Sequence, residues 1–120
     1  MTAAEHDHIF AAVSHLPHLA AFALVDELAA RPEAQTFFRH AGSGFRDFTR
    51  IAGSSPEMWR DIALANRRQL SQALSLYVER LRSLQTAIDS GDAAAIEDFL
   101  REAKAQRDHW HAQSFSLSPE

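Results

Sequence analysis

Apolar residues recur at alternating steps of four and three in the second half of the chain, and this spacing constrains the fold most. The positions are Leu70, Leu74, Tyr77, Leu81, Leu84 and Ile88. A repeat near 3.5 residues predicts a helix that packs lengthwise against another helix. We expect one helix over residues 56–89, with Ser55 as its cap and Pro56 at its first position. At ~1.5 Å per residue it would span about 50 Å.

A helix of this length exceeds the diameter of a domain built from 120 residues. Part of its apolar stripe is therefore expected to meet a second subunit, and a symmetric homodimer is the simplest arrangement. The alternative is that the whole stripe packs within one chain.

The other segments also predict helices, and none shows the alternating pattern of a strand. The expected elements are a first helix over 4–30 kinked at Pro17, a helical turn and loop over 33–44, a short helix over 45–52 and a last helix over 93–107. Gly91 is expected to end the long helix and Asp92 to cap the last one. The fold class is therefore all-α, with one helical domain over 1–110 and a polar, disordered tail over 111–120.

Composition excludes several classes of function. The formal net charge of −4 disfavours a nucleic-acid partner, which would attract the opposite sign. The absence of cysteine excludes disulfides, thiolate metal sites and thiol catalysis. No apolar run approaches ~20 residues and no secretory signal is visible at the N-terminus, so we expect no membrane span and a cytoplasmic location.

The segment GSGFRDFTRIA at 42–52 contains the strongest candidate for a binding site. Two glycines, two residues apart, let backbone N–H groups converge before a helix start, which attracts anions. Asp47 and Arg50 are three apart and share a helix face, so the carboxylate is expected to orient the guanidinium toward an incoming carboxylate. The alternative is a glycine turn with a surface ion pair.

Histidines gather near the N-terminus, and the kink at Pro17 opens space beside them. Ser14 and His18 are four apart, which places them near one another on a helix. Taken alone, each histidine is most simply a part-buried, hydrogen-bonded residue. Metal binding by His6, His8, His15 and His18 is the alternative, but zinc needs three or four convergent ligands, and we expect no metal.

Several uncommon strings occur in a fixed order. They are HD at 6–7, SHLPH at 14–18, GSGFRDFTRIA at 42–52 and SSPEMWRDI at 54–62. Together they resemble the C-terminal domain of the prephenate/arogenate dehydrogenase family, over nearly the whole chain from about Glu5. The chain departs from the family pattern at Ser43, where glycine is usual, and at Gly53, where another residue is usual.

The resemblance implies the substrate-binding and dimerisation portion of an NAD(P)-dependent enzyme of tyrosine biosynthesis, which oxidatively decarboxylates prephenate to 4-hydroxyphenylpyruvate. It implies that His18 and Arg50 line the substrate pocket and that Asp47 belongs to an ionic network that positions the arginine. The resemblance also implies that Asp7 lies near that pocket. Ser14 and Gly44, in the same matched strings, complete the candidate set.

The cofactor domain of that family is not found in this sequence. No G-x-G-x-x-G motif follows a strand, and no acidic ribose partner is present. We therefore expect a Rossmann domain, in cis or in trans, to bind NAD or NADP and to supply the catalytic base, and the isolated chain to be inactive. A non-catalytic helical dimer module, or a regulatory domain that binds tyrosine, is the alternative function. The sequence leaves open prephenate versus arogenate, NAD versus NADP, and whether the chain is a fragment or half of a split gene.

Overall fold

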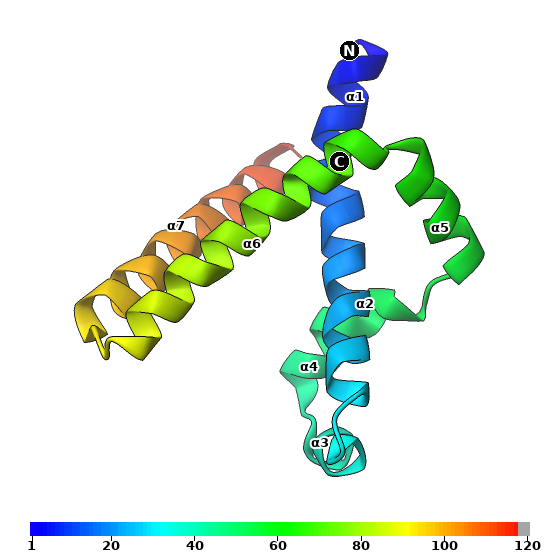
Figure 1. Ribbon diagram of the computed structural model, residues 1–120. Coiled ribbons are helices and arrows are strands. Elements are labelled where there is room, and N and C mark those ends of the chain that lie inside the picture. The colour runs from blue at the N-terminus through cyan, green and yellow to red at the C-terminus, as the bar shows by residue number, and fades with distance from the viewer. Residues whose placement is uncertain (118–120) are drawn as a thin grey trace. The chain divides into compact units, whose positions relative to one another are not determined.

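A computed structural model describes residues 1–117 of the chain (Figure 1). The described part contains helices, turns and loops but no strand, which confirms the predicted all-α fold class. It divides into two compact units, Met1–Leu76 and Tyr77–Glu120, which we describe separately.

The first unit begins with a helical stretch made of α1 (Ala3–Phe10), a π-helical turn η1 (Ala11–His15) and α2 (Leu16–Ala29). The predicted kink at Pro17 takes the form of this wider turn, in which the N–H of Leu16 bonds to the carbonyl of Ala11, five residues back. Proline has no N–H, and its ring clashes with the carbonyl four residues earlier. A local π turn relieves the clash without ending the helix.

The stretch Ala3–Ala29 is also long and apolar enough to cross a membrane, judged by length and composition alone. We did not expect such a segment from the sequence. The stretch meets this criterion of length and composition because it is rich in alanine and holds few acidic or basic residues. The core helix of a soluble protein passes the same test, so this finding is weak evidence for a membrane span.

Three short helices follow and contact α2. They are α3 (Ala34–His40), α4 (Ser43–Thr49) and the 3-10 turn η2 (Arg50–Gly53). The helix predicted over 45–52 therefore starts earlier and changes type before Arg50. Thr49 has φ −94° and ψ 0°, outside the α-helical range, so α-helical spacing does not continue into η2.

Two helices, α5 (Pro56–Ala65) and α6 (Arg67–Asp89), replace the single helix predicted over 56–89 (Figure 1). The predicted Ser55 cap is confirmed, because its hydroxyl accepts the N–H of Met58 at 3.2 Å. The helix breaks at Asn66, whose backbone has φ −118° and ψ 36°. With 23 residues, α6 is about 35 Å long, shorter than predicted.

The second unit is a hairpin of the later part of α6 and α7 (Ala93–Leu117), which run side by side (Figure 1). Gly91 ends α6 with φ +65°, and the N–H of Asp92 bonds to the carbonyl of Ala87 at 3.1 Å, as in a Schellman motif. The Asp92 carboxylate then accepts the N–H of Ala95 at 3.0 Å. Both predictions for this turn are confirmed.

Helix α7 continues to Leu117, so the predicted end at Arg107 is wrong. Pairs of side chains four and three residues apart support the extension. Lys104 donates to Asp108 at 2.6 Å, and the Arg107 guanidinium lies 4.7 Å from the centre of the Trp110 ring. The tail predicted to be disordered is therefore helical over 111–117, and 118–120 lie outside the described residues. The domain boundary at 110 stays a prediction.

Burial is concentrated in the first unit. The buried side chains are Ala11, Ala21, Trp59, Asn66 and Leu70. Over residues 77–114 of the second unit no side chain is buried, and many large apolar residues are exposed. Two helices alone bury little apolar surface, so this hairpin needs a further surface to complete a core.

Candidate functional site

Trp59 is at the centre of a cluster of ring side chains in the first unit. It projects from α5 and is 7% exposed. The ring of His18 stacks on it, with ring centres 4.0 Å apart and planes at 18°. The ring of His15 meets it edge-on, at 6.0 Å and 76°. Two of the predicted histidines therefore share one aromatic partner that we did not single out from the sequence.

A backbone contact fixes the proton of His18. Its Nδ1 lies 2.8 Å from the carbonyl oxygen of Ser14. A carbonyl only accepts, so Nδ1 carries the proton, and Nε2 of the neutral ring is left as an acceptor. The four-residue spacing of Ser14 and His18 thus brings them together, through the carbonyl of Ser14 rather than its hydroxyl.

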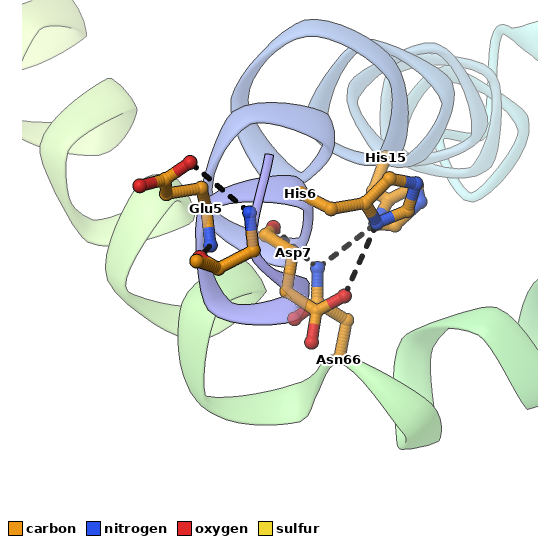
Figure 2. Close-up of polar contacts among 6 residues, drawn as sticks. Glu5, His6, Asp7, His15 and Asn66 are labelled. Carbon is orange, nitrogen blue, oxygen red and sulfur yellow. Dashed lines mark hydrogen bonds and ion pairs between the residues drawn. The ribbon is translucent and has the colours of Figure 1, made fainter.

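Asn66 connects the break between α5 and α6 to the N-terminal helices (Figure 2). This side chain is 8% exposed, and its Nδ2 donates to the carbonyl of Asp7 at 2.8 Å and to Nδ1 of His15 at 3.2 Å. Because the amide nitrogen only donates, Nδ1 of His15 must accept, which places the ring proton on Nε2. His15 and His18 therefore hold opposite tautomers.

The surroundings of His15 favour its neutral form. Burial is the largest cause that lowers its pKa below the ordinary value, and the neighbouring His6 lowers it further. The carboxylate of Asp7 acts in the opposite direction, and His18 lowers the pKa slightly. The pKa shift agrees with the contact to Asn66, since a protonated ring would point a second donor at the amide nitrogen.

Asp7 takes part mainly through its backbone. Its carbonyl accepts from Asn66, whereas its exposed carboxylate lies 3.3 Å from Nδ1 of His6 (Figure 2). The His6 ring in turn lies against Phe10, with ring centres 4.5 Å apart. The predicted site residue is therefore well anchored, and its charged group stays accessible to solvent.

Arg50 lines a separate hollow of about 380 Å³ between α3, α4 and η2. The lining residues are Phe38, Ala41, Gly42, Phe45, Arg46, Thr49 and Arg50. The rings of Phe38 and Phe45 lie 6.0 Å apart and give it an aromatic wall. Two guanidinium groups and no carboxylate line this hollow, so its charge favours an anion.

Asp47 and Arg50 do not form the predicted ion pair. Neither of them has an ion-pair partner among the residues that the structure describes. The reason is the change of helix type between them. Asp47 lies in α4 and Arg50 begins η2, so the two do not share one α-helical face.

The glycine turn is also different from the prediction. Gly44 is the second residue of α4 rather than part of a loop, and among the described residues only Gly91 has a positive φ. A Cβ added at Gly42 or Gly44 would meet nothing within 4 Å. The fold of this chain therefore does not itself require glycine at either position.

Four of the six predicted residues fall into two groups, and Asp47 and Gly44 belong to neither. Arg50 alone lines the hollow beside α4, while His18, Ser14 and Asp7 belong to the contacts around Trp59 and Asn66. Sequence reasoning missed Trp59, Asn66 and Arg46. One signal for Asn66 was available, because it lies four residues from both Ile62 and Leu70, on the face that those apolar residues share.

The residues present do not fit a dinucleotide cofactor or a metal. No strand precedes a glycine-rich turn anywhere in the described chain, as a Rossmann site requires. Within residues 1–117, no three His, Asp or Glu side chains converge as metal ligands would. The charge of the hollow beside Arg50 favours a small anion, and the separate cluster around Trp59 holds two histidines whose ring hydrogen bonds define their tautomers.

Comparison with known proteins gives consistent matches. The family described as "Prephenate dehydrogenase, dimerization domain" matches residues 2–104. Cyclohexadienyl dehydrogenase of Zymomonas mobilis is 35% identical over 109 residues, which are 89% of this chain and 37% of that protein. The chain spans about a third of the length of the curated relatives it matches, with shares of 37%, 29% and 30%.

Solved structures match as well. Arogenate dehydrogenase of Synechocystis superposes with a TM-score of 0.86 at 31% identity, over 92% of this chain and 41% of that one. Prephenate dehydrogenase of A. aeolicus, solved with hydroxyphenyl propionate and NAD+, superposes with a TM-score of 0.83 at 41% identity. That match covers 91% of this chain and 38% of the other.

Proposed function

Because this chain belongs to the family of prephenate dehydrogenase dimerization domains, we propose that it is the substrate-binding and dimerisation portion of a prephenate or arogenate dehydrogenase. The activity would be the NAD(P)-dependent oxidative decarboxylation of prephenate to 4-hydroxyphenylpyruvate, in the cytoplasm. The family match over residues 2–104 is the observation that carries this proposal.

The substrate would bind through Arg50 and His18. Arg50 would pair with a substrate carboxylate, because a guanidinium is an accessible group in a hollow that holds no carboxylate of its own. His18 would accept a hydrogen bond at Nε2, which its contact with Ser14 leaves unprotonated. The A. aeolicus relative supports this ligand class, since hydroxyphenyl propionate joins a phenol to a carboxylate.

The other candidates would support substrate binding from outside the hollow that Arg50 lines. Asp7, Ser14, Asp47 and Gly44 lie in the strings that carry the family resemblance, and all four belong to the first unit. Gly44 has open space around it, which leaves room for a ligand or a neighbouring domain to approach the backbone.

The hydride acceptor would be NAD or NADP, held by a Rossmann domain in cis or in trans, because the described residues of this chain do not form a dinucleotide site. The task of this chain is to orient the anionic substrate and to limit its motion. The base that takes the hydroxyl proton would lie on the other domain.

The homodimer would form through the α6–α7 hairpin. Its exposed apolar side chains are Tyr77, Val78, Leu81, Ile88, Leu100 and Trp110. Exposed apolar surface of this kind marks an interface. The matching family is one of dimerization domains, which supports a second copy of this chain as the occupant.

Titration calorimetry of the purified chain with prephenate tests the ligand assignment. We expect Arg50→Ala to weaken binding by about 1.5–3 kcal/mol, roughly 10- to 100-fold, because it removes a charge-assisted pair. Arg68→Ala is the matched control, since Arg68 is an exposed arginine outside the hollow. Unchanged affinity for the Arg50 variant in a chain that still dimerises would favour a purely structural module.

A further inference from the structure

Arg46 is an unexplained cation in the hollow that Arg50 lines. Arg46 lies in α4, whereas Arg50 begins η2, so arginines from two elements line one hollow. Both side chains are exposed, and neither has an ion-pair partner among the described residues. Of these two arginines, the family resemblance implied a role only for Arg50.

Two like charges that line one small hollow repel each other unless an anion separates them. The carboxylate nearest in sequence, Asp47, does not line the hollow and is paired with neither arginine. A ligand with one carboxylate would compensate one guanidinium and leave the other uncompensated. A ligand with two carboxylates would compensate both.

Two aromatic residues of the same lining constrain the rest of the ligand. Phe38 and Phe45 present rings 6.0 Å apart, which suits a flat or ring-shaped apolar body. The volume of about 380 Å³ lies in the range of small-molecule sites. Together the walls describe a ring compound that carries two separated carboxylates.

We propose that Arg46 is a specificity-determining residue that binds the second carboxylate of the substrate, so that the site selects dianions over monoanions. This inference rests on the proposed function, in which Arg50 binds the first carboxylate. Prephenate has two carboxylates. Its decarboxylated product has one, so the product would lose the contact with Arg46 and bind more weakly than the substrate.

The test compares two ligands with the 120-residue chain at neutral pH, where both ligands are ionised. Prephenate is the dianion, and hydroxyphenyl propionate is the monoanion. Affinities are measured by titration calorimetry for the wild type, Arg46→Gln, Arg50→Gln and the control Arg68→Gln. Circular dichroism of each variant checks that it is folded.

We expect the wild type to prefer prephenate, and Arg46→Gln to weaken prephenate binding about tenfold while hydroxyphenyl propionate binding changes little. The preference for the dianion should therefore collapse in this variant and persist in the control. Prephenate binding to the wild type should also fall more steeply with added salt than binding to the variant.

Two different results would overturn the inference, and they separate it from the proposed function. If Arg46→Gln leaves the preference for prephenate intact while Arg50→Gln abolishes binding, Arg46 is not a ligand and the proposed function stands. If neither arginine variant changes either affinity, or the wild type binds neither compound, both proposals fail.

Discussion

At the scale of single residues, Asn66 has the largest predicted effect on stability. Its buried amide donates to the carbonyl of Asp7 and to Nδ1 of His15. Asn66→Ala would leave both acceptors without a donor, which should lower the free energy of unfolding by about 1–3 kcal/mol. Urea denaturation followed by circular dichroism measures this change.

The matched control is Gln69→Ala. The Oε1 atom of Gln69, in α6, accepts a hydrogen bond from Nδ1 of His8 in α1 at 3.1 Å, in an exposed position. Water replaces such a contact at little cost, so the control should lose less than about 1 kcal/mol. Equal losses in the two variants would show that burial of the amide is not the source of the effect.

The lowered pKa of His15 predicts how the free energy of unfolding depends on pH. Its pKa in the folded chain is lowered, mainly by burial, below the 6.5 of the unfolded chain. Between these two values the unfolded chain binds more protons, so the stabilisation by neutral His15 is fully present above 6.5 and is lost as pH falls through the folded-state pKa. Urea midpoints should therefore decrease from about pH 7.5 to about pH 5.5.

His15→Gln should flatten this dependence, because it removes the titrating group. His40→Gln is the control, since His40 is exposed on α3 and bonds only to the carbonyl of Thr36. A slope that is unchanged by His15→Gln, or that is reduced equally by His40→Gln, would contradict the assignment.

The candidate site was only partly predictable at this scale. Arg50 and His18 stood out because they lie in short strings whose chemistry and family resemblance can be read locally. Trp59 and Asn66 act through residues more than forty positions away, such as His15 and Asp7. No local pattern specifies such partners. The pairing of Asp47 with Arg50 failed because a helix-type change at Thr49 is not visible in spacing.

At the scale of elements, local signals predicted helix ends well. Ser55 and Asp92 cap helices through their own side chains, which accept backbone N–H groups three residues later. Gly91 ends a helix because glycine readily adopts a left-handed backbone. The break at Asn66 could not be predicted from such local signals. Its backbone is not helical, and its side-chain amide bonds to the carbonyl of Asp7, which is distant in sequence. Ile62 and Leu70 lie four residues on either side of Asn66, so the sequence pattern shows no interruption there.

The hairpin of α6 and α7 gives a prediction about assembly. Leu81 lies in the apolar repeat of α6 and is 47% exposed within the chain. Leu81→Glu would place a charge in the proposed interface between two copies, at a desolvation cost that should shift the chain to monomers. Sedimentation velocity over a range of concentrations measures the change.

Gln85→Glu is the control for this experiment. It adds a carboxylate at an exposed position of the same helix without removing apolar surface, and the dimer should persist. A dimer that survives Leu81→Glu, or a wild-type chain that sediments as a monomer, would argue that this face of α6 is not the interface.

At the scale of the whole molecule, the two units support different parts of the proposed function. The first unit holds the hollow beside Arg50 and the cluster around Trp59. The second unit exposes the apolar residues that a partner would cover. Neither unit offers a dinucleotide site within residues 1–117. The proposed function therefore assigns substrate binding and assembly to this chain, and hydride transfer to a further domain.

This division predicts that the purified chain alone does not oxidise prephenate. In the proposed function this chain orients the substrate, but its described residues form no Rossmann site and hold no assigned base, so no rate above the uncatalysed reaction is expected. The formation of reduced nicotinamide, followed by absorbance with NAD and then with NADP, measures the rate. A full-length relative assayed in parallel shows that the substrate is intact. Turnover by this chain that disappears in Arg50→Ala would mean that it holds a complete active site, and the proposed division of tasks between domains would be wrong.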